Sequence, residues 1–216
     1  SPASRPIKRM RLGIFGGTFD PVHYGHLLLA ECCREQAQLD EVWFVPAAIA
    51  PHKSDRPPTP PAARVEMLEL AIGGNEQFSL CLIEVEHKGV NFTVDTLKEI
   101  KAAQPESELF FLMGADSLVD LPTWRDPEGI CELATPLVVA RPGSAAPDFD
   151  CLKEIVSPER LAVMRDSVVE MPLMGISSTE IRTRAARGQS IRYRTPAAVA
   201  TYIENAELYR DSLSPA

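Results

Sequence analysis

A short run near the start of the chain, GIFGGTFDPVHYGHLLLAE, places glycines, two histidines and a helix start directly after an apolar strand. Gly16 and Gly17 allow the backbone to turn sharply and to approach a ligand closely. A helix that begins near Tyr24 points its first N–H groups and the positive end of its dipole at the same space. His23 and His26 lie three positions apart, so their imidazoles can share one face of the first turn. The run therefore predicts an anion site suited to phosphate.

Two other interpretations of this run are open. The glycine pair by itself is equally compatible with a tight strand–helix turn that binds nothing. A zinc site built from His23, His26, Cys32 and Cys33 is disfavoured, because the spacing matches no usual zinc site and the cysteines fall in the body of a predicted helix. The sequence has neither a GxGxxG dinucleotide loop nor a P-loop at this place.

A second run, GISSTEIR, places hydroxyl side chains at another predicted helix start. Ser177, Ser178 and Thr179 offer hydroxyl and N–H groups, and Arg182 follows one turn later on the same face. Alone, the run is explained more simply as an N-terminal capping box with solvated Thr179 and Arg182. Its occurrence together with the first run favours a second phosphate-binding helix start.

The elements that must position these residues alternate between strand and helix. We expect strands at 10–15, 41–46, 78–86, 108–116, 135–142 and 166–173, and helices at 26–38, 63–74, 93–105, 177–188 and 195–209. Thr93 and Thr195 are the expected N-caps of their helices. This alternation predicts an α/β, doubly wound, mostly parallel sheet with helices on both faces. Ligands of such sheets bind beyond the carboxyl ends of the strands, so 16–17, 114–116 and 177–179 should converge on one edge.

Composition limits the class of protein. The chain has 216 residues, 45% of them hydrophobic and 24% charged, which fits a globular protein. Its net charge of -8 argues against bulk electrostatic binding to nucleic acid, although a small anionic ligand responds to its local site. No apolar run is long enough for a membrane span, so we expect no membrane partner.

We expect residues 1–9 to be a tail, without the apolar region of a secretion signal, and residues 10–216 to form a single domain. Five cysteines with irregular spacing predict a reducing, cytoplasmic setting.

The two runs also carry a resemblance. GGTFDPVHYGH is similar to the signature of the HxGH nucleotidyltransferases, and GISSTEIR is similar to their second signature, ISSTxxR. Within that superfamily, the chain resembles the bacterial nicotinate-nucleotide adenylyltransferases from about Leu12 to Tyr209. The segments that narrow the resemblance are DEVWFVP…PHK, NFTVDTL, FFLMGADSLVDLPTW and SIRYRTPAAVATYIENAELY. It implies a Rossmann-like fold and an enzyme that joins ATP and nicotinate mononucleotide into nicotinate adenine dinucleotide, releasing pyrophosphate.

The resemblance also implies roles for particular residues. It implies catalytic roles for His26, His23 and Lys53. It implies ATP contacts for Gly16, Gly17, Thr18, Phe19, His23, His26, Gly114, Asp116, Ile176, Ser177, Ser178, Thr179 and Arg182. It implies that nicotinate mononucleotide contacts His52, Lys53, Thr93, Trp124 and Arg125.

Each of these roles has a simpler alternative. A loop Lys is usually a surface residue, Trp124 can pack rather than stack on a pyridine ring, and Asp116 can cap a short helix rather than bind a ribose. The chain departs from the family where Ala47 and Ala48 replace a stretch that often holds Asn, so the resemblance implies no polar side-chain contact there. The sequence has no acidic cluster for a metal, and we expect Mg²⁺ to be carried mainly by the ATP phosphates, with no metal site in the protein.

Two rival functions fit the same motifs. One is another adenylyltransferase of the superfamily, for example one with phosphopantetheine as the acceptor. The other is a nucleotide-binding module without catalysis, which could lose His26; the presence of both histidines favours an enzyme. The sequence is compatible with a homo-oligomer and does not determine the oligomeric state.

Overall fold

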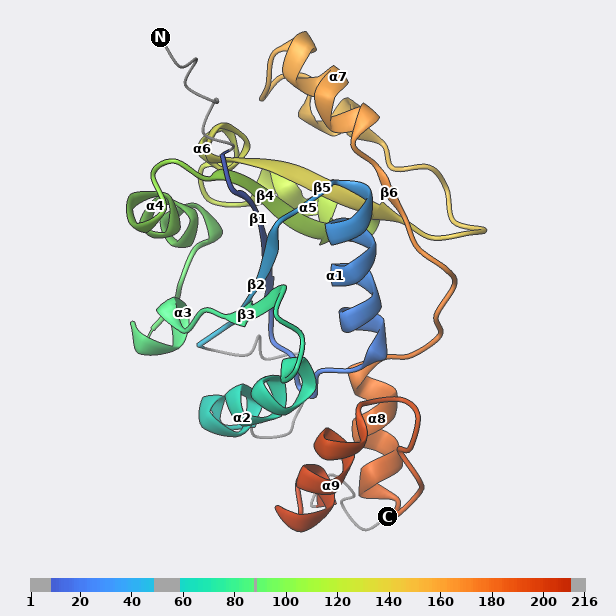
Figure 1. Cartoon of the computed structure of the whole chain (residues 1–216). Coiled ribbons are helices and arrows are strands. Elements are labelled where there is room, and N and C mark those ends of the chain that lie inside the picture. The colour runs from blue at the N-terminus through green and yellow to red at the C-terminus, as the bar shows by residue number, and fades with distance from the viewer. Residues whose placement is uncertain (1–8, 49–58, 88, 211–216) are drawn as a thin grey trace, which may run out of the picture.

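A computed structural model describes residues 9–48, 59–87 and 89–210. The elements follow in the order β1 (Arg11–Gly17), α1 (Tyr24–Gln36), β2 (Glu41–Pro46), α2 (Pro61–Ile72), β3 (Phe78–Leu80), α3 (Ile83–Glu86), α4 (Thr93–Ala103), β4 (Glu108–Gly114), α5 (Ala115–Asp120), η1 (Leu121–Thr123), α6 (Pro127–Leu133), β5 (Ala134–Ala140), η2 (Phe149–Leu152), α7 (Pro158–Asp166), β6 (Val169–Glu170), α8 (Ser178–Ala186) and α9 (Ala197–Asn205). Figure 1 shows these elements along the chain.

The strands form one six-stranded sheet in the order β3-β2-β1-β4-β5-β6, and every neighbouring pair is parallel. The chain winds outward from β1 to β3 and then returns to the other side of β1 with β4. This reversal makes the carboxyl ends of β1 and β4 the switch point of the sheet, where doubly wound folds bind their ligands. The predicted parallel, doubly wound α/β fold is confirmed.

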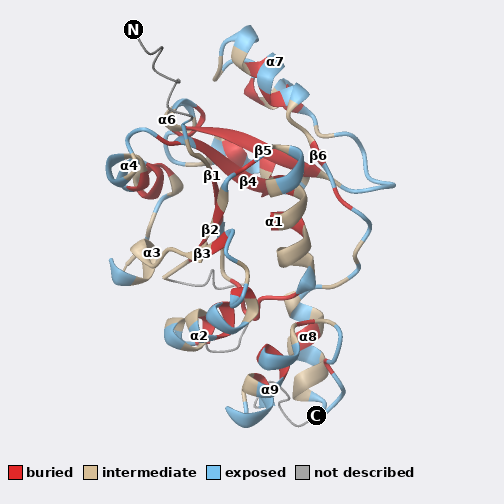
Figure 2. Cartoon of the chain, viewed as in Figure 1, coloured by how far each residue is buried: buried red, intermediate tan, exposed pale blue. Residues whose placement is uncertain are grey.

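Helices cover both faces of the sheet, and each face has its own apolar core (Figure 1). One core joins the apolar sides of α1 and α2 to Phe15 and Phe44 of the strands, and it continues to α8 and α9. The other joins α4, α5, α6 and α7 to Leu12 and Ile14 of β1. Alternate residues of β1 thus enter opposite cores, as expected for a strand covered on both sides. Figure 2 shows the buried residues concentrated in the strands and on the inner sides of the helices.

The strand expected at 78–86 is wrong beyond Leu80. β3 pairs only with β2, through Phe78, Ser79 and Leu80, and the chain then turns into the short helix α3. The alternating pattern of this segment is typical of a strand, but its last main-chain bond to β2 runs from the N–H of Cys81 to the carbonyl of Phe44 at 2.9 Å, and helix α3 begins at Ile83.

Two predicted helix caps are also wrong. The N-cap of α4 is Phe92, and Thr93 is the first helical residue. The N-cap of α9 is Pro196, while the hydroxyl of Thr195 donates to the carbonyl of Val22 at 2.8 Å. Thr195 therefore joins the C-terminal part of the chain to the first motif instead of capping its own helix.

Candidate active site

The loop after β1 is held by its own aromatic residue. Phe19 has a positive φ of 49° and a side chain that is 2% exposed, and its ring packs 5.3 Å from Phe15 and 5.6 Å from Phe44. A Cβ added to Gly17 would lie 3.0 Å from the Phe19 ring, so only glycine fits without displacing the ring. Gly16 is exposed at the end of the strand, and Thr18 is half-buried. The loop thus presents main chain to the outside, and Phe19 can reach a ligand only through its backbone.

His23 and His26 form the reciprocal cap of α1. The N–H of Gly25 donates to Nδ1 of His23 at 3.1 Å, and the N–H of His23 donates to Nδ1 of His26 at 3.3 Å. The two rings stack with their centroids 3.8 Å apart. A Cβ on Gly25 would lie 2.9 Å from the His23 ring, which explains the glycine between the two histidines. The predicted helix start near Tyr24 and the shared face of the histidines are confirmed.

Burial keeps both imidazoles neutral. It lowers the pKa of His23 to about 4, and the charge of Arg141 adds to this effect. Burial, together with the neighbouring His23, lowers the pKa of His26 well below its ordinary value. Because both Nδ1 atoms accept hydrogen bonds, the proton of each neutral ring lies on Nε2. Each ring can therefore offer an Nε2–H donor to an anion.

The expectation that α1 offers free N–H groups is wrong for its first residues. The N–H of Tyr24 donates to the carbonyl of Arg194 at 3.1 Å, and the N–H of Gly25 is taken by His23. At this helix start the Nε2–H groups of the two histidines, rather than these N–H groups, are available as donors.

The second motif contacts the first directly. The hydroxyl of Ser178 donates to the carbonyl of Pro21 at 2.8 Å, and Nη1 of Arg182 donates to the carbonyl of Asp20 at 2.8 Å. Ser177 is the N-cap of α8, because its hydroxyl accepts the N–H of Glu180. Figure 1 shows α8 beside the N-terminal end of α1. The predicted convergence of the two runs is confirmed, and so is the capping role of Ser177.

The remaining groups of the second motif are arranged around this contact. Nη2 of Arg182 lies 3.3 Å from the hydroxyl of Thr179, to which it donates. Ile176 packs partly against the core, and its carbonyl would lie 3.6 Å from a Cβ on Gly25. The chain between Ile176 and Thr179 thus lies directly beside the first turn of α1.

The third segment expected at this edge follows β4. Gly114 ends β4 next to β1 and is the N-cap of α5, and a Cβ placed on it would meet nothing within 4 Å. Asp116 lies exposed in the first turn of α5 and is not its capping residue. The carboxylate of Asp116 is thus placed at the switch point, at the carboxyl end of the strand that neighbours β1.

Trp124, Arg125 and the start of α4 come together on the other side of the sheet. The guanidinium of Arg125 lies 4.6 Å from the ring centroid of Phe92 and 3.7 Å from a carboxylate oxygen of Asp95. Trp124 packs edge-on against Phe111 at 6.0 Å and is half-buried. Thr93 opens α4, whose first N–H groups have no carbonyl partner inside the helix. Thr93, Trp124 and Arg125 are the residues that the resemblance places at the pyridine ring. The contacts of Arg125 with Phe92 and Asp95 show that their two segments are neighbours.

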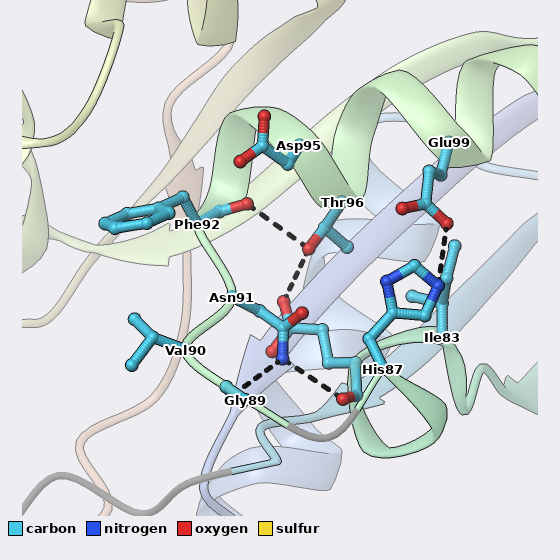
Figure 3. A pocket seen from close by; sticks show the side chains of 10 residues that line it. Ile83, His87, Gly89, Val90, Asn91, Phe92, Asp95, Thr96 and Glu99 are labelled. Atoms are coloured by element: carbon cyan, nitrogen blue, oxygen red, sulfur yellow. Dashed lines mark hydrogen bonds and ion pairs between the residues drawn. The ribbon is translucent and has the colours of Figure 1, made fainter.

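A hydrogen-bond network holds the segment before α4 in place. Residues of this segment line a pocket (Figure 3). The hydroxyl of Thr96 donates to Oε1 of Glu84 at 2.7 Å and lies 3.4 Å from the carbonyl of Phe92. The amide of Asn91 donates to the carbonyls of Glu84 and Gly89. Burial raises the pKa of Glu84, and the hydrogen bond from Thr96 acts against this rise. The network fixes the turn that leads into Thr93.

Some predicted residues lie outside the part of the chain that the structure describes. His52 and Lys53 are among them. Ala47 and Ala48 follow β2 within the described part, and the N–H of Ala47 donates to the carbonyl of Gly17 at 2.9 Å. The main chain after β2 thus lies beside the first motif even where the polar side chain of the family is missing.

Two basic residues near the site are absent from the predictions made from sequence. Arg64 is fully buried on α2 and donates to the carbonyl of Thr18. Arg141 follows β5 at its carboxyl end, close enough for its charge to lower the pKa of His23. A basic residue directly after a buried strand is a signal that could have indicated Arg141. The helical spacing of Arg64 with Leu68 places both on one face, but the apolar Val65 also has helical spacing with Leu68 and is the more usual residue for a buried face.

Neither a metal cluster nor a membrane span is found in the described residues. Within 9–48, 59–87 and 89–210, no three His, Cys, Asp or Glu side chains gather where they could hold a metal ion. In the same ranges no helix has the length and apolar character needed to cross a bilayer. All five cysteines, each of which is described, are free thiols.

The parallel sheet, its switch point and the joined motifs place this chain among the nucleotidyltransferases, and residues 14–184 match the cytidylyltransferase-like family. A protein of Thermomicrobium roseum named "Probable nicotinate-nucleotide adenylyltransferase" is 47% identical over 93% of this chain and 92% of its own length. One of Exiguobacterium sibiricum with the same name is 46% identical over 93% of this chain and 99% of its own. The chain belongs to the nicotinate-nucleotide adenylyltransferase family.

Solved structures agree on the fold. The nicotinic acid mononucleotide adenylyltransferase of Plasmodium falciparum complexed with NaAD superposes with a TM-score of 0.70 at 20% identity. The match covers 93% of this chain and 98% of that one. The Rossmann-like fold expected from the resemblance is confirmed.

Proposed function

We propose that this chain transfers the adenylyl group of ATP to nicotinate mononucleotide, giving nicotinate adenine dinucleotide and pyrophosphate in NAD biosynthesis. The names of its relatives and its membership of their family support this activity. The observation that carries the proposal is the contact between the two motifs, through Ser178 with Pro21 and Arg182 with Asp20. This contact places two neutral imidazoles beside a second helix start, in an arrangement suited to a triphosphate.

The reaction needs no protein nucleophile. An oxygen of the mononucleotide 5′-phosphate attacks the α-phosphorus of ATP in line and forms the new P–O bond. The bond from the α-phosphorus to the bridging oxygen breaks, and pyrophosphate leaves with the electron pair. The protein then acts by positioning and by stabilising the charge that develops on the phosphate oxygens.

The residues take the following roles in this mechanism. Nε2–H groups of His23 and His26 donate to phosphate oxygens of ATP, and the main chain at Gly16, Gly17, Thr18 and Phe19 faces the same phosphates. The start of α8, with Ser177, Ser178, Thr179 and Arg182, holds the β- and γ-phosphates. Gly114, Asp116 and Ile176 contact the nucleoside, and Lys53 neutralises charge at the reacting phosphates.

The acceptor is held on the other side of the sheet. The first N–H groups of α4 at Thr93 face the nicotinate carboxylate, Trp124 stacks on the pyridine, and Arg125 and His52 complete the site. Magnesium enters as the ATP complex, as part of the substrate. The free thiols fit a reducing cytoplasm as the place of action. We further propose that residues 10–216 act as one domain.

The test is pyrophosphate release from ATP with each acceptor in turn. We expect rapid release and formation of the dinucleotide with nicotinate mononucleotide. Faster release with phosphopantetheine would assign the chain to the rival adenylyltransferase. ATP binding without pyrophosphate release under any acceptor would support the non-catalytic module. Nicotinamide mononucleotide as a further acceptor measures the preference for the carboxylate.

A further inference from the structure

Arg64 lies on α2 with an exposed fraction of 0%, although a charged side chain is rarely buried fully unless it is paired. Burial lowers its pKa, and the nearby charges of Asp20 and Tyr209 oppose this effect. A guanidinium in such a place must satisfy its N–H donors within the protein. The partners of those donors therefore show what the residue is for.

Four hydrogen bonds of Arg64 end on main-chain carbonyls from separate segments. Nη1 donates to Thr18 at 2.8 Å, in the loop after β1. Nη2 donates to Ala47 at 2.7 Å and to Ala48 at 3.2 Å, in the chain after β2. Nε donates to Thr59 at 3.2 Å, just before α2. The planar fork of the guanidinium suits this use, because its donors point in several fixed directions.

These bonds begin where the sheet ladder ends. β1 and β2 pair up to Gly17 with Pro46, and the N–H of Ala47 donates to the carbonyl of Gly17. Beyond that point, Arg64 joins the two chains by binding the carbonyl of Thr18 and those of Ala47 and Ala48. Its guanidinium thus extends the connection between the two strands into the loops at their carboxyl ends.

A buried hydrogen-bonded pair, Asp20 and Tyr209, holds the loop after β1. The hydroxyl of Tyr209 donates to Oδ1 of Asp20 at 2.7 Å, and both residues are buried. The main-chain carbonyl of Asp20 accepts from Arg182 of the second motif. The loop after β1 is therefore held by Arg64 at Thr18, by Tyr209 at Asp20, and by α8 at Asp20 and Pro21.

We propose that Arg64, together with the Asp20–Tyr209 pair, is a positioning residue that fixes the loop after β1 relative to the chain after β2 for adenylyl transfer. The inference rests on the proposed function. In-line attack requires the reacting atoms of two substrates to lie about 3–3.5 Å apart, and a small misplacement costs turnover. Arg64 itself is buried beneath the loops and touches neither substrate. Its loss should therefore lower kcat with both substrates saturating, while ATP alone still binds.

The test compares Arg64→Lys with Arg160→Lys. Lysine keeps the charge but has one nitrogen, which cannot reach carbonyls in all these directions. Arg160 is a matched control, because its Nε and Nη2 also donate to a main-chain carbonyl, that of Cys131, at 3.2 and 2.9 Å. For each variant, kcat, both KM values, the Kd of ATP without acceptor and the thermal unfolding midpoint are measured.

We expect kcat of Arg64→Lys to fall about tenfold or more, with a Kd of ATP within about threefold of the unmodified chain. Arg160→Lys should leave both values unchanged. A kcat of Arg64→Lys within about twofold of the unmodified chain overturns the inference. The inference is also overturned if kcat falls only in proportion to the fraction of unfolded protein, or only together with ATP binding.

If Arg64→Lys does not fold, a second variant tests the same inference. Tyr209→Phe removes the bond to Asp20 and should lower kcat about threefold or more, with the Kd of ATP retained. An unchanged kcat in that variant overturns the inference. If the unmodified chain forms no dinucleotide, the proposed function fails; if it does and the variants match it, only this inference fails.

Discussion

The hydroxyl of Ser178 donates a hydrogen bond of 2.8 Å to the carbonyl of Pro21, a residue 157 positions earlier in the chain. This bond joins the first turn of α8 to the loop that precedes α1. With the bond from Arg182 to Asp20, it fixes one helix start against the other. Two short motifs that are far apart in the sequence are thereby held as one unit.

Replacing Ser178 by Ala should loosen this unit. The carbonyl of Pro21 loses its donor, which costs about 1 kcal/mol of stability when water can partly replace it. We expect KM for ATP to rise several-fold with a smaller change in KM for the mononucleotide. Steady-state kinetics with each substrate varied in turn would measure this. Ser190→Ala is a suitable control, because Ser190 lies outside both motifs; an equal rise in both KM values for Ser178→Ala would contradict a specific role at the ATP side.

Replacing His26 by Ala should reduce turnover by about 10² or more and leave the fold intact, because it removes the Nε2–H donor that we propose faces the developing phosphate charge. Pyrophosphate release gives kcat, and circular dichroism reports the fold. The side chain of His26 also accepts the N–H of His23, so some loss of thermal stability is expected as well. His87→Ala is the matched control, since His87 pairs with Glu99 on the α3–α4 side, where its Nε2 lies 3.3 Å from a carboxylate oxygen. Near-normal turnover of His26→Ala would remove this residue from the mechanism.

The sequence was sufficient for the parallel fold because each strand is a short apolar run bounded by Gly, Pro or polar residues. It was sufficient for the two helix starts because glycines and hydroxyl residues have direct local consequences for the backbone. It was not sufficient where a local pattern depends on a distant partner. The run 78–86 alternates like a strand, yet β2 pairs with only its first three residues. The hydroxyl of Thr195 has a better partner in Val22 than its own helix offers.

Arg64 illustrates the same limit within the site. On α2 the apolar residues Val65, Leu68 and Ile72 have helical spacing in the sequence, whereas Arg64, Met67, Leu68 and Ile72 are the buried residues. A buried arginine is favourable only because four carbonyls from other segments surround it. No helical periodicity contains that information, since the carbonyls belong to the tertiary structure.

Replacing Thr96 by Val should affect the acceptor side of the site. Valine keeps the shape of the side chain but removes the donor to Glu84, leaving a half-buried carboxylate with a further raised pKa. The expected cost is about 1–2 kcal/mol of unfolding free energy. We expect KM for nicotinate mononucleotide to rise several-fold while KM for ATP stays within about twofold, because the network fixes only the turn before Thr93. Thr96→Ser, which keeps the donor, should restore the KM; a KM that remains high in Thr96→Ser would show that packing, not the hydrogen bond, is responsible.

The stability of the fold should fall between about pH 6.5 and pH 4 in a way that depends on His23. Its pKa is about 4 in the folded chain and near 6.5 in the unfolded chain, so the unfolded state binds more protons in this interval. The contribution of His23 is therefore fully present above pH 6.5 and is lost as the pH falls through this range, by on the order of 3 kcal/mol.

His23→Asn removes this contribution, because Asn keeps an N-cap acceptor for α1 and does not titrate, and it also removes the effect of His23 on the pKa of His26. Urea unfolding at several pH values would give the free energy of unfolding of both proteins, and the carboxylates contribute equally to each. The difference between the two proteins should change across pH 6.5 to 4 and stay constant above pH 7. Parallel curves over the whole range would mean that His23 has the same pKa in the folded and the unfolded chain, which would contradict the view that burial keeps its imidazole neutral below pH 6.5.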